Sequence, residues 1–341
     1  MVSTMGVIAR CGVGAMIWAS AAGCHSERAM AAANFSRTSR FFVTSPPARG
    51  TVIFEADVNP DIPVAGFKAH HGGRPFWYLL NFAPQLRLRM YQTDSSPVRS
   101  PSYMPRIDLY TMARMGSWAG RTAWAGMQLT VGHHSNGQDG CTFTSQDGNF
   151  DLEDGRRIGD CVEVPGRERE LNHLNGSFGL NYFRVALPLY LYETDATHPK
   201  VAHFLRPSVD LGTFSEDIDT APIYPRRRVA LEYRYEHLVD FDFPITFGRG
   251  SREHIWGIWL EGVRRFGVED DAFFPGGWSG QQFSLEGEVS IAERASGLGI
   301  FIGGYIGRDY YNITFDEEIA VIRGGVFWRH AGLSNLDKLG E

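Results

Sequence analysis

The stretch that decides the fold is residues 228–238, which read RVALEYRYEHL. Successive side chains of a β-strand point to opposite faces, so residues two apart share a face. One face of this stretch carries Val229, Leu231, Tyr233 and Tyr235, and the other carries Ala230, Glu232, Arg234 and Glu236. Its length matches the roughly 9–11 residues that a tilted strand needs to cross a bilayer. The stretch therefore predicts a long strand with one apolar face and one charged face.

The same period-two pattern recurs along most of the chain, for example at residues 86–90, where Arg87 and Arg89 alternate with apolar residues. The candidate strands are 76–82, 86–93, 104–113, 121–135, 177–191, 200–211, 227–238, 254–265, 282–292, 298–309 and 318–329. A bacterial barrel has an even number of strands, so we expect twelve. The missing strand is either Phe241–Phe247 or Thr51–Val58.

Two architectures produce this alternation. A soluble sandwich buries the apolar faces between two sheets, whereas a transmembrane barrel turns them to lipid and encloses the charged faces. Strand length, and charges of both signs that can pair in a lumen, favour the barrel. We predict an all-β protein, an antiparallel transmembrane β-barrel of about 12 strands with a long extracellular loop, located in an outer membrane.

The composition and the two terminal segments of the sequence complete the predicted domain assignment. The chain has 341 residues and a net charge of −6 without a basic block, which gives no support for nucleic-acid binding. Residues 1–33 are predicted to be an export signal, with either a lipidated Cys24 or a cut near Ala31. Residues 34–74 are interpreted as an N-terminal extension, 75–330 as the barrel and 331–341 as a polar tail.

The longest connection, residues 138–176, is polar and contains Cys141 and Cys161. Long loops of outer-membrane barrels are extracellular. An exported chain meets an oxidising compartment, so we predict a disulfide between these two cysteines.

The strand 121–135 ends in the sequence GHHSNG at residues 132–137. His133 and Ser135 share the face of Val131, which would be the lipid face of a barrel. His-x-Ser at a strand end is common by chance, so a functional interpretation needs a third group that orients the imidazole. Asn181 lies on the apolar face of the next strand, where an amide needs a hydrogen-bond partner.

These residue types suit acyl transfer. Ser135 would attack an acyl carbonyl, His133 would accept its proton, and Asn181 would fix the tautomer. An imidazole has an ordinary pKa of about 6.5, which is suitable for a general base at neutral pH. Backbone N–H groups in the turn at Asn136 and Gly137 would face the developing oxyanion.

Three ordered segments resemble the outer membrane phospholipase A family. Residues 133–137 match its His-x-Ser-Asn-Gly, residues 95–99 and 103–105 are similar to its Ser-Ser-Pro-Phe-Arg and Tyr-x-Pro, and residues 177–181 are similar to its Ser-x-x-x-Asn. The resemblance implies a twelve-stranded barrel with a Ser/His/Asn site on its lipid face. It also implies hydrolysis of glycerophospholipid acyl esters, a requirement for Ca²⁺ and an active homodimer.

Carried over residue by residue, the resemblance implies calcium ligands at the Gln138 carbonyl, the Ser177 hydroxyl and the Ser95 hydroxyl of a second copy. Calcium-bound water and the Gly137 amide would then stabilise the oxyanion. The chain departs from the family because residues 138–176 intervene between Ser135 and Asn181.

Other interpretations remain open. Asn172 and Asn175 compete with Asn181 for the third role, although Asn181 alone has both a Ser four residues before it and an apolar phase after it. Lipid A deacylases are barrels that also use His-x-Ser-Asn, with an acidic third group. A barrel that serves as a scaffold or pore is the non-enzymatic alternative.

Overall fold

The computed structural model describes most of the segments between residues 39 and 328. The described ranges are 39–44, 52–71, 74–91, 100–147, 161–166, 170–173, 175–194, 199–214, 227–240, 253–266, 279, 282–294, 296–310 and 318–328. None of the residues in these ranges forms a helix long and apolar enough to cross a membrane.

The described chain forms one large antiparallel sheet and a small two-stranded ribbon. The strands of the large sheet are β1 (Ser39–Thr44), β2 (Val52–Val58), β3 (Ile62–His71), β4 (Arg74–Tyr91), β5 (Ser102–Trp118), β6 (Arg121–Ser135), β9 (Gly179–Ala186), β10 (Leu189–Thr194), β11 (Pro199–Phe214), β12 (Arg227–Asp240), β13 (Glu253–Phe266), β14 (Phe283–Glu293), β15 (Leu298–Arg308) and β16 (Glu318–Trp328). The ribbon consists of β7 (Gln146–Asp147) and β8 (Val162–Glu163).

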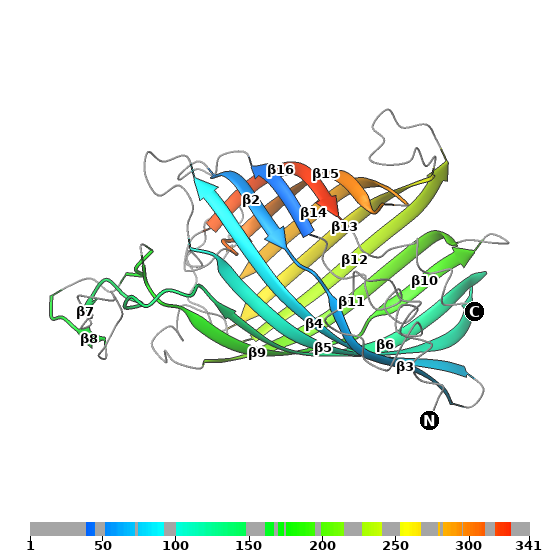
Figure 1. Cartoon of the computed structure of the whole chain (residues 1–341), viewed down its shortest axis with the longest axis horizontal. Coiled ribbons are helices and arrows are strands. Elements are labelled where there is room, and N and C mark those ends of the chain that lie inside the picture. The colour runs from blue at the N-terminus through cyan, green and yellow to red at the C-terminus, as the bar shows by residue number, and fades with distance from the viewer. Residues whose placement is uncertain are drawn as a thin grey trace, which may run out of the picture.

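Two pairs of these segments are single strands with an interruption. β2 and β3 both pair with β4, and β9 and β10 both pair with β6 and β11. Counting each interrupted strand once gives twelve strands. β1 pairs with both β2 and β16, and β9–β10 joins β6 to β11, so the sheet closes into a barrel (Figure 1).

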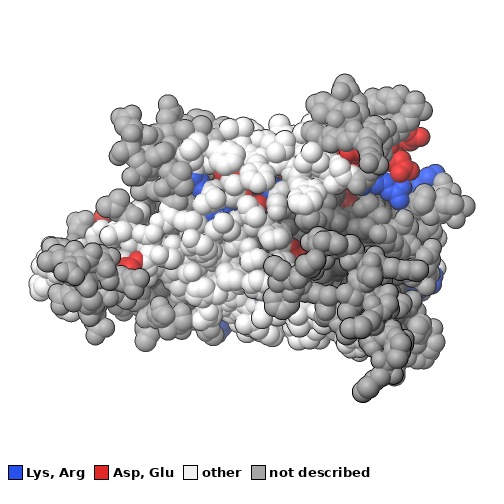
Figure 2. All heavy atoms as spheres, in the orientation of Figure 1, with Lys and Arg blue, Asp and Glu red and all other residues white. Residues whose placement is uncertain are grey.

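The barrel carries its apolar side chains outside and its charged side chains inside. Val131, Ile302 and Ile322 on the outer face are 62%, 62% and 64% exposed, whereas Arg87 and Arg89 are 6% and 3% exposed. Over the middle of the described surface, Lys, Arg, Asp and Glu are scarce (Figure 2). This inversion is typical of a barrel that faces lipid and excludes the soluble sandwich.

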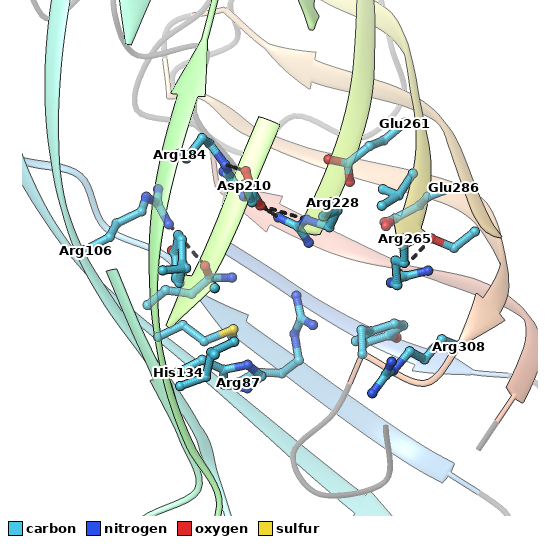
Figure 3. A pocket seen from close by; sticks show the side chains of 18 of the residues that line it. Arg87, Arg106, His134, Arg184, Asp210, Arg228, Glu261, Arg265, Glu286 and Arg308 are labelled. Carbon is cyan, nitrogen blue, oxygen red and sulfur yellow. Dashed lines mark hydrogen bonds and ion pairs between the residues drawn. The ribbon is translucent and has the colours of Figure 1, made fainter. Parts of the chain in front are cut away.

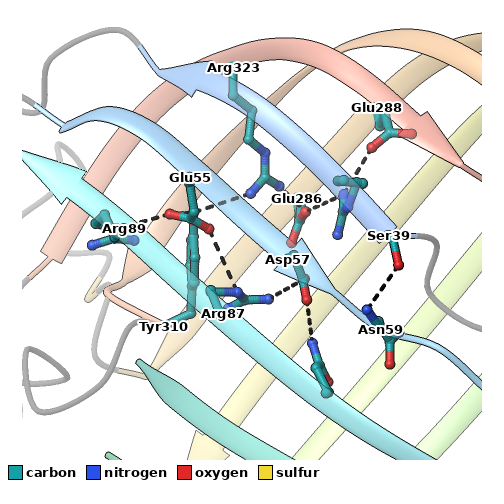
Figure 4. Close-up of polar contacts among 12 residues, drawn as sticks. Ser39, Glu55, Asp57, Asn59, Arg87, Arg89, Glu286, Glu288, Tyr310 and Arg323 are labelled. Atoms are coloured by element: carbon teal, nitrogen blue, oxygen red, sulfur yellow. Dashed lines mark hydrogen bonds and ion pairs between the residues drawn. The ribbon is translucent and has the colours of Figure 1, made fainter. Parts of the chain in front are cut away.

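The enclosed charges pair across neighbouring strands, as Figure 4 shows for β2 and β4. Arg89 Nε donates to Glu55 Oε2 at 2.9 Å, and the Tyr310 hydroxyl donates to the same oxygen at 3.2 Å. Arg87 Nη2 donates to Asp57 Oδ2 at 2.7 Å. Buried charges need such partners because desolvation of an unpaired ion is costly.

An apolar cluster fills the lumen at the end opposite the 138–176 loop. Its members come from the ends of β4, β5, β6, β10, β11 and β13 that are distant from that loop, and they are Trp77, Met112, Trp124, Tyr190, Tyr192, Ala202, Phe204 and Ile255. Trp124 Nε1 donates to the Tyr192 hydroxyl at 3.3 Å. At this end, therefore, apolar side chains occupy the space next to these six strands.

The predicted fold class and the twelve strands are confirmed, and the predicted strand Thr51–Val58 contains all of β2 (Val52–Val58). Two details were wrong. Residues 39–44 and 52–71 are barrel strands, so the part of the expected 34–74 extension that the structure describes belongs to the barrel. Candidates 76–82 and 86–93 form one strand, β4. Residues 1–33, 241–247 and 331–341 lie outside the described ranges.

A buried and an exposed glutamate can test the role of the lumen pairs. Glu55 is 1% exposed, whereas the side chain of Glu193 is 53% exposed and lies 3.7 Å from Arg121. We expect Glu55→Gln to lower the free energy of unfolding by about 1.5–3 kcal/mol, because it weakens the buried hydrogen bond to the charged Arg89, which keeps Asp309 as a second partner at 2.8 Å. Glu193→Gln should lower it by less than about 1 kcal/mol. Urea denaturation of the refolded barrel, followed by tryptophan fluorescence, measures both; equal effects would contradict the prediction.

Candidate active site

The candidate site lies where β6 ends and β9 begins, two neighbouring antiparallel strands. Their register places His133 opposite Asn181 and Ser135 opposite Gly179. His133 and Ser135 share the phase of the exposed Val131, and Asn181 shares the phase of the exposed Phe183. All three side chains are therefore on the outer face of the barrel, at the end that carries the long loop.

The structure joins two of these predicted residues by a hydrogen bond. His133 Nδ1 lies 2.8 Å from Asn181 Oδ1. An amide oxygen only accepts, so Nδ1 carries the proton in the neutral ring and Nε2 is left as an acceptor. This is the tautomer that a general base for Ser135 requires.

The two competing asparagines, Asn172 and Asn175, form hydrogen bonds within the 138–176 loop instead. Asn172 Nδ2 donates to the Cys141 carbonyl at 3.1 Å and to Asn175 Oδ1 at 2.7 Å. The Asn175 carbonyl accepts from the backbone N–H of Gly140 at 3.0 Å. Of the three candidates for the third role, Asn181 is the one that contacts His133.

Asn136 has a structural role that the sequence analysis missed. Its side chain is 1% exposed and connects the two ends of the 138–176 loop. Nδ2 donates to the Gly176 carbonyl at 2.6 Å, while Oδ1 accepts from the backbone N–H groups of Phe178 at 3.1 Å and Gln138 at 3.3 Å. By residue type Asn136 is a turn former, and only the fold reveals which second segment it contacts.

Gly137, the expected oxyanion donor, follows on the exposed surface in a left-handed conformation with φ of 63°. A Cβ at this position would lie 3.0 Å from the ring of Tyr103, which is paired with Ser135 across β5 and β6. Glycine is therefore favoured here both by the backbone conformation and by the close approach of this ring.

Two of the three expected calcium ligands, Gln138 and Ser177, lie on chain segments that are joined by a backbone hydrogen bond. The Ser177 N–H donates to the Gly140 carbonyl at 2.8 Å, two residues from Gln138. Gln138 and Ser177 offer carbonyl and hydroxyl oxygens, which suit a hard cation. Ser95 lies outside the described residues. Within the described ranges, the structure brings together no group of three or more His, Cys, Asp or Glu side chains that could hold a metal.

The loop itself is braced by the predicted disulfide. Cys141 and Cys161 are bonded to each other, and the β7–β8 ribbon pairs Gln146 with Glu163. Figure 1 shows β7 and β8 beyond the end of the barrel. The predicted pairing of the two cysteines is confirmed.

A closed barrel with an apolar exterior and a charged interior defines the class of outer-membrane β-barrels.

No protein-family model and no curated protein sequence matches the chain. Several solved structures are similar to this chain, including the following three. Outer membrane phospholipase A from Escherichia coli has 12% identity and a TM-score of 0.46 over 88% of this chain and 97% of its own. The β domain of the Bordetella autotransporter BrkA has 9% identity and a TM-score of 0.34 over 86% and 96%. The transport unit of the autotransporter AIDA-I from Escherichia coli has 9% identity and a TM-score of 0.31 over 86% and 90%. These likenesses are too distant to carry an argument about activity.

The contacts of Asn136 predict a local effect of its removal. Asn136→Ala leaves the N–H groups of Phe178 and Gln138 without their acceptor, at a cost of about 1–3 kcal/mol for each buried group. We expect hydrogen–deuterium exchange at Phe178 to accelerate roughly tenfold or more. Asn175→Ala, which removes an exposed side chain of the same loop, is the matched control. Unchanged exchange at Phe178 in the Asn136 variant would rule out this structural role of Asn136.

Proposed function

We propose that this protein is an outer-membrane phospholipase A, a calcium-dependent enzyme that hydrolyses acyl esters of glycerophospholipids. One observation carries the proposal: on the lipid-facing side of the barrel, His133 Nδ1 contacts Asn181 Oδ1 at 2.8 Å, with Ser135 two residues further along the same face. A buried or lipid-facing amide and imidazole are costly unless they are paired. Their pairing beside a serine supports acyl transfer to a lipid-soluble substrate.

The proposed reaction has two steps. In the first, Ser135 Oγ attacks the acyl carbonyl carbon while His133 Nε2 accepts the hydroxyl proton. The ester C–O bond then breaks, and His133 returns that proton to the departing glycerol oxygen. In the second step, His133 accepts a proton from water, the hydroxide attacks the acyl-serine, and the fatty acid leaves as Ser135 is reprotonated. Throughout, Asn181 holds the imidazole in one tautomer.

Charge on the tetrahedral intermediates requires stabilisation by donors next to Ser135. The backbone N–H of Gly137 is the proposed donor of this chain. Gln138 and Ser177 would hold a calcium ion through oxygen atoms, and when bound the ion supplies positive charge close to the developing oxyanion. Ser95 of a second copy is proposed as the third ligand, which would make a homodimer the active form.

Two alternatives make different predictions. A lipid A deacylase would act on lipid A and not on glycerophospholipids, and Asn181 in place of an acidic group weighs against it. An open pore is disfavoured because the cluster around Trp77 and Phe204 fills one end of the described lumen. A scaffold without enzymatic activity would release no fatty acid.

Substitutions in the proposed triad test the enzyme directly. In detergent micelles that contain phosphatidylcholine and calcium, we expect Ser135→Ala to reduce fatty acid release roughly a thousandfold or more. Asn181→Ala should reduce it roughly 100-fold, since a misoriented imidazole is a poor base. Asn172→Ala, the same substitution in the loop, should remain active. Full activity of Ser135→Ala would refute the mechanism, and release from lipid A alone would favour the deacylase.

Metal removal tests the cofactor separately. A chelator should abolish fatty acid release, and calcium should restore it better than magnesium, which binds poorly where strict octahedral geometry is not offered. Ser177→Ala should raise the calcium concentration for half-maximal activity roughly tenfold or more. Thr144→Ala removes another hydroxyl of the loop and is the control. Activity that persists in the chelator would remove calcium from the proposal and leave the triad standing.

A further inference from the structure

A cavity of about 180 Å³ lies inside the barrel, in the half of the lumen nearer the long loop. It is bounded by the loop-side portions of strands around most of the barrel (Figure 3), whereas the apolar cluster around Trp77 and Phe204 fills the other half. By the same measure one water needs about 10–15 Å³. The cavity therefore has room for a small solute together with several waters.

Cationic side chains outnumber anionic ones two to one in the wall of this cavity. Eight arginines line it: Arg87, Arg106, Arg184, Arg206, Arg228, Arg265, Arg308 and Arg323. Four carboxylates line it: Asp210, Glu261, Glu286 and Asp309. In Figure 3 the labelled arginines come from opposite walls and point into the space between them.

Arg184, Arg206 and Arg228 each share a carboxylate with a second guanidinium group. Arg184 donates to Asp210 at 2.6 and 2.9 Å, and Arg228 Nε donates to the same carboxylate at 2.7 Å. Arg206 and Arg234 both contact Glu232. One carboxylate neutralises one cation, so the wall near Asp210 carries an excess of positive charge, whereas Arg87 and Arg106 each contact two carboxylates.

Arg265 contacts a hydroxyl group instead of a carboxylate. It is 8% exposed, its Nη2 donates to the Ser284 hydroxyl at 3.0 Å, and its Nη1 is buried without a hydrogen-bond partner. Within the part of the chain that the structure describes, no carboxylate forms an ion pair with it. A buried guanidinium without a counterion is strongly unfavourable, so this group calls for an anion in the cavity.

We propose that the cavity is a binding site for a small free oxyanion of the phosphate class, with Arg265 as its anchor. The planar fork of a guanidinium matches two oxygens of a tetrahedral oxyanion. Such an ion offers acceptors to several walls at once and has few heavy atoms, which suits the cavity volume. Lipid headgroups are excluded as the source because the barrel wall separates this space from the bilayer.

Phosphate binding is measured on the refolded barrel in detergent, by calorimetry and by thermal melting, in phosphate and in chloride at equal ionic strength. We expect phosphate to bind the wild type and to raise its Tm by a few degrees relative to chloride. Arg265→Gln should weaken binding at least tenfold and lose the shift in Tm. In chloride this variant should melt no lower than the wild type, because a buried uncompensated charge has been removed.

Arg264→Gln is the matched control, since Arg264 is the exposed neighbour on the same strand and does not line the cavity. Arg265→Lys keeps the charge but loses the fork, and it replaces the Gln variant if that fails to refold; it too should bind phosphate more weakly than the wild type. Equal binding by wild type and the Arg265 variants would overturn the proposal, as would equal effects of chloride and phosphate. Neither readout depends on ester hydrolysis, so the proposed phospholipase can fail without affecting this test.

Discussion

A strand that faces lipid must find every backbone hydrogen-bond partner within the protein, and the rest of this structure depends on that constraint. Closure through β1, which pairs with both β2 and β16, meets it by removing the edges of the sheet. Once the sheet is closed, the alternating side chains must place their apolar members toward lipid and their charged members toward the lumen. Apolar residues such as Val131 face outward, and Arg87 and Arg89 face inward.

The inward charges in turn fix the register of the strands. A slip of one residue between β2 and β4 would turn Arg87 and Arg89 to lipid and separate them from Asp57 and Glu55. Removing one member of such a pair is costly, whereas apolar residues of similar size could replace the whole pair at little cost. The lumen pairs therefore specify the register more than they add to stability. Where carboxylates are too few, around Arg265, the same physics leaves a cavity that favours an anion.

Period-two alternation predicted eleven strands, and the even number required of a barrel predicted the twelfth, but two strands that contain a proline were not recognised as continuous. Pro84 lies between candidates 76–82 and 86–93, opposite Pro105 within the continuous β4–β5 pair. Both missing donors fall at one step of the ladder, so the strand continues past them. Pro60 likewise interrupts a strand that resumes at Ile62 along the same partner, β4. The low strand propensity of proline indicates a local interruption of the pairing. Whether the strand ends there depends on the backbone hydrogen bonds to the neighbouring strands on either side.

The contact between His133 and Asn181 was predictable from the alternation of side chains that also predicted the barrel. An amide in phase with Phe183 on a lipid face needs a partner, and the antiparallel register supplies His133. Chain separation between Ser135 and Asn181 is a poor criterion, because the entropic cost of a longer loop grows slowly with its length. The positions of Ser135 and Asn181 depend instead on whether the two ends of the 138–176 loop are held together. Asn136 holds them through contacts with Gly176 and Phe178, contacts that no local pattern could reveal. An insertion of this length can therefore lie between Ser135 and Asn181 without moving either from the face they share.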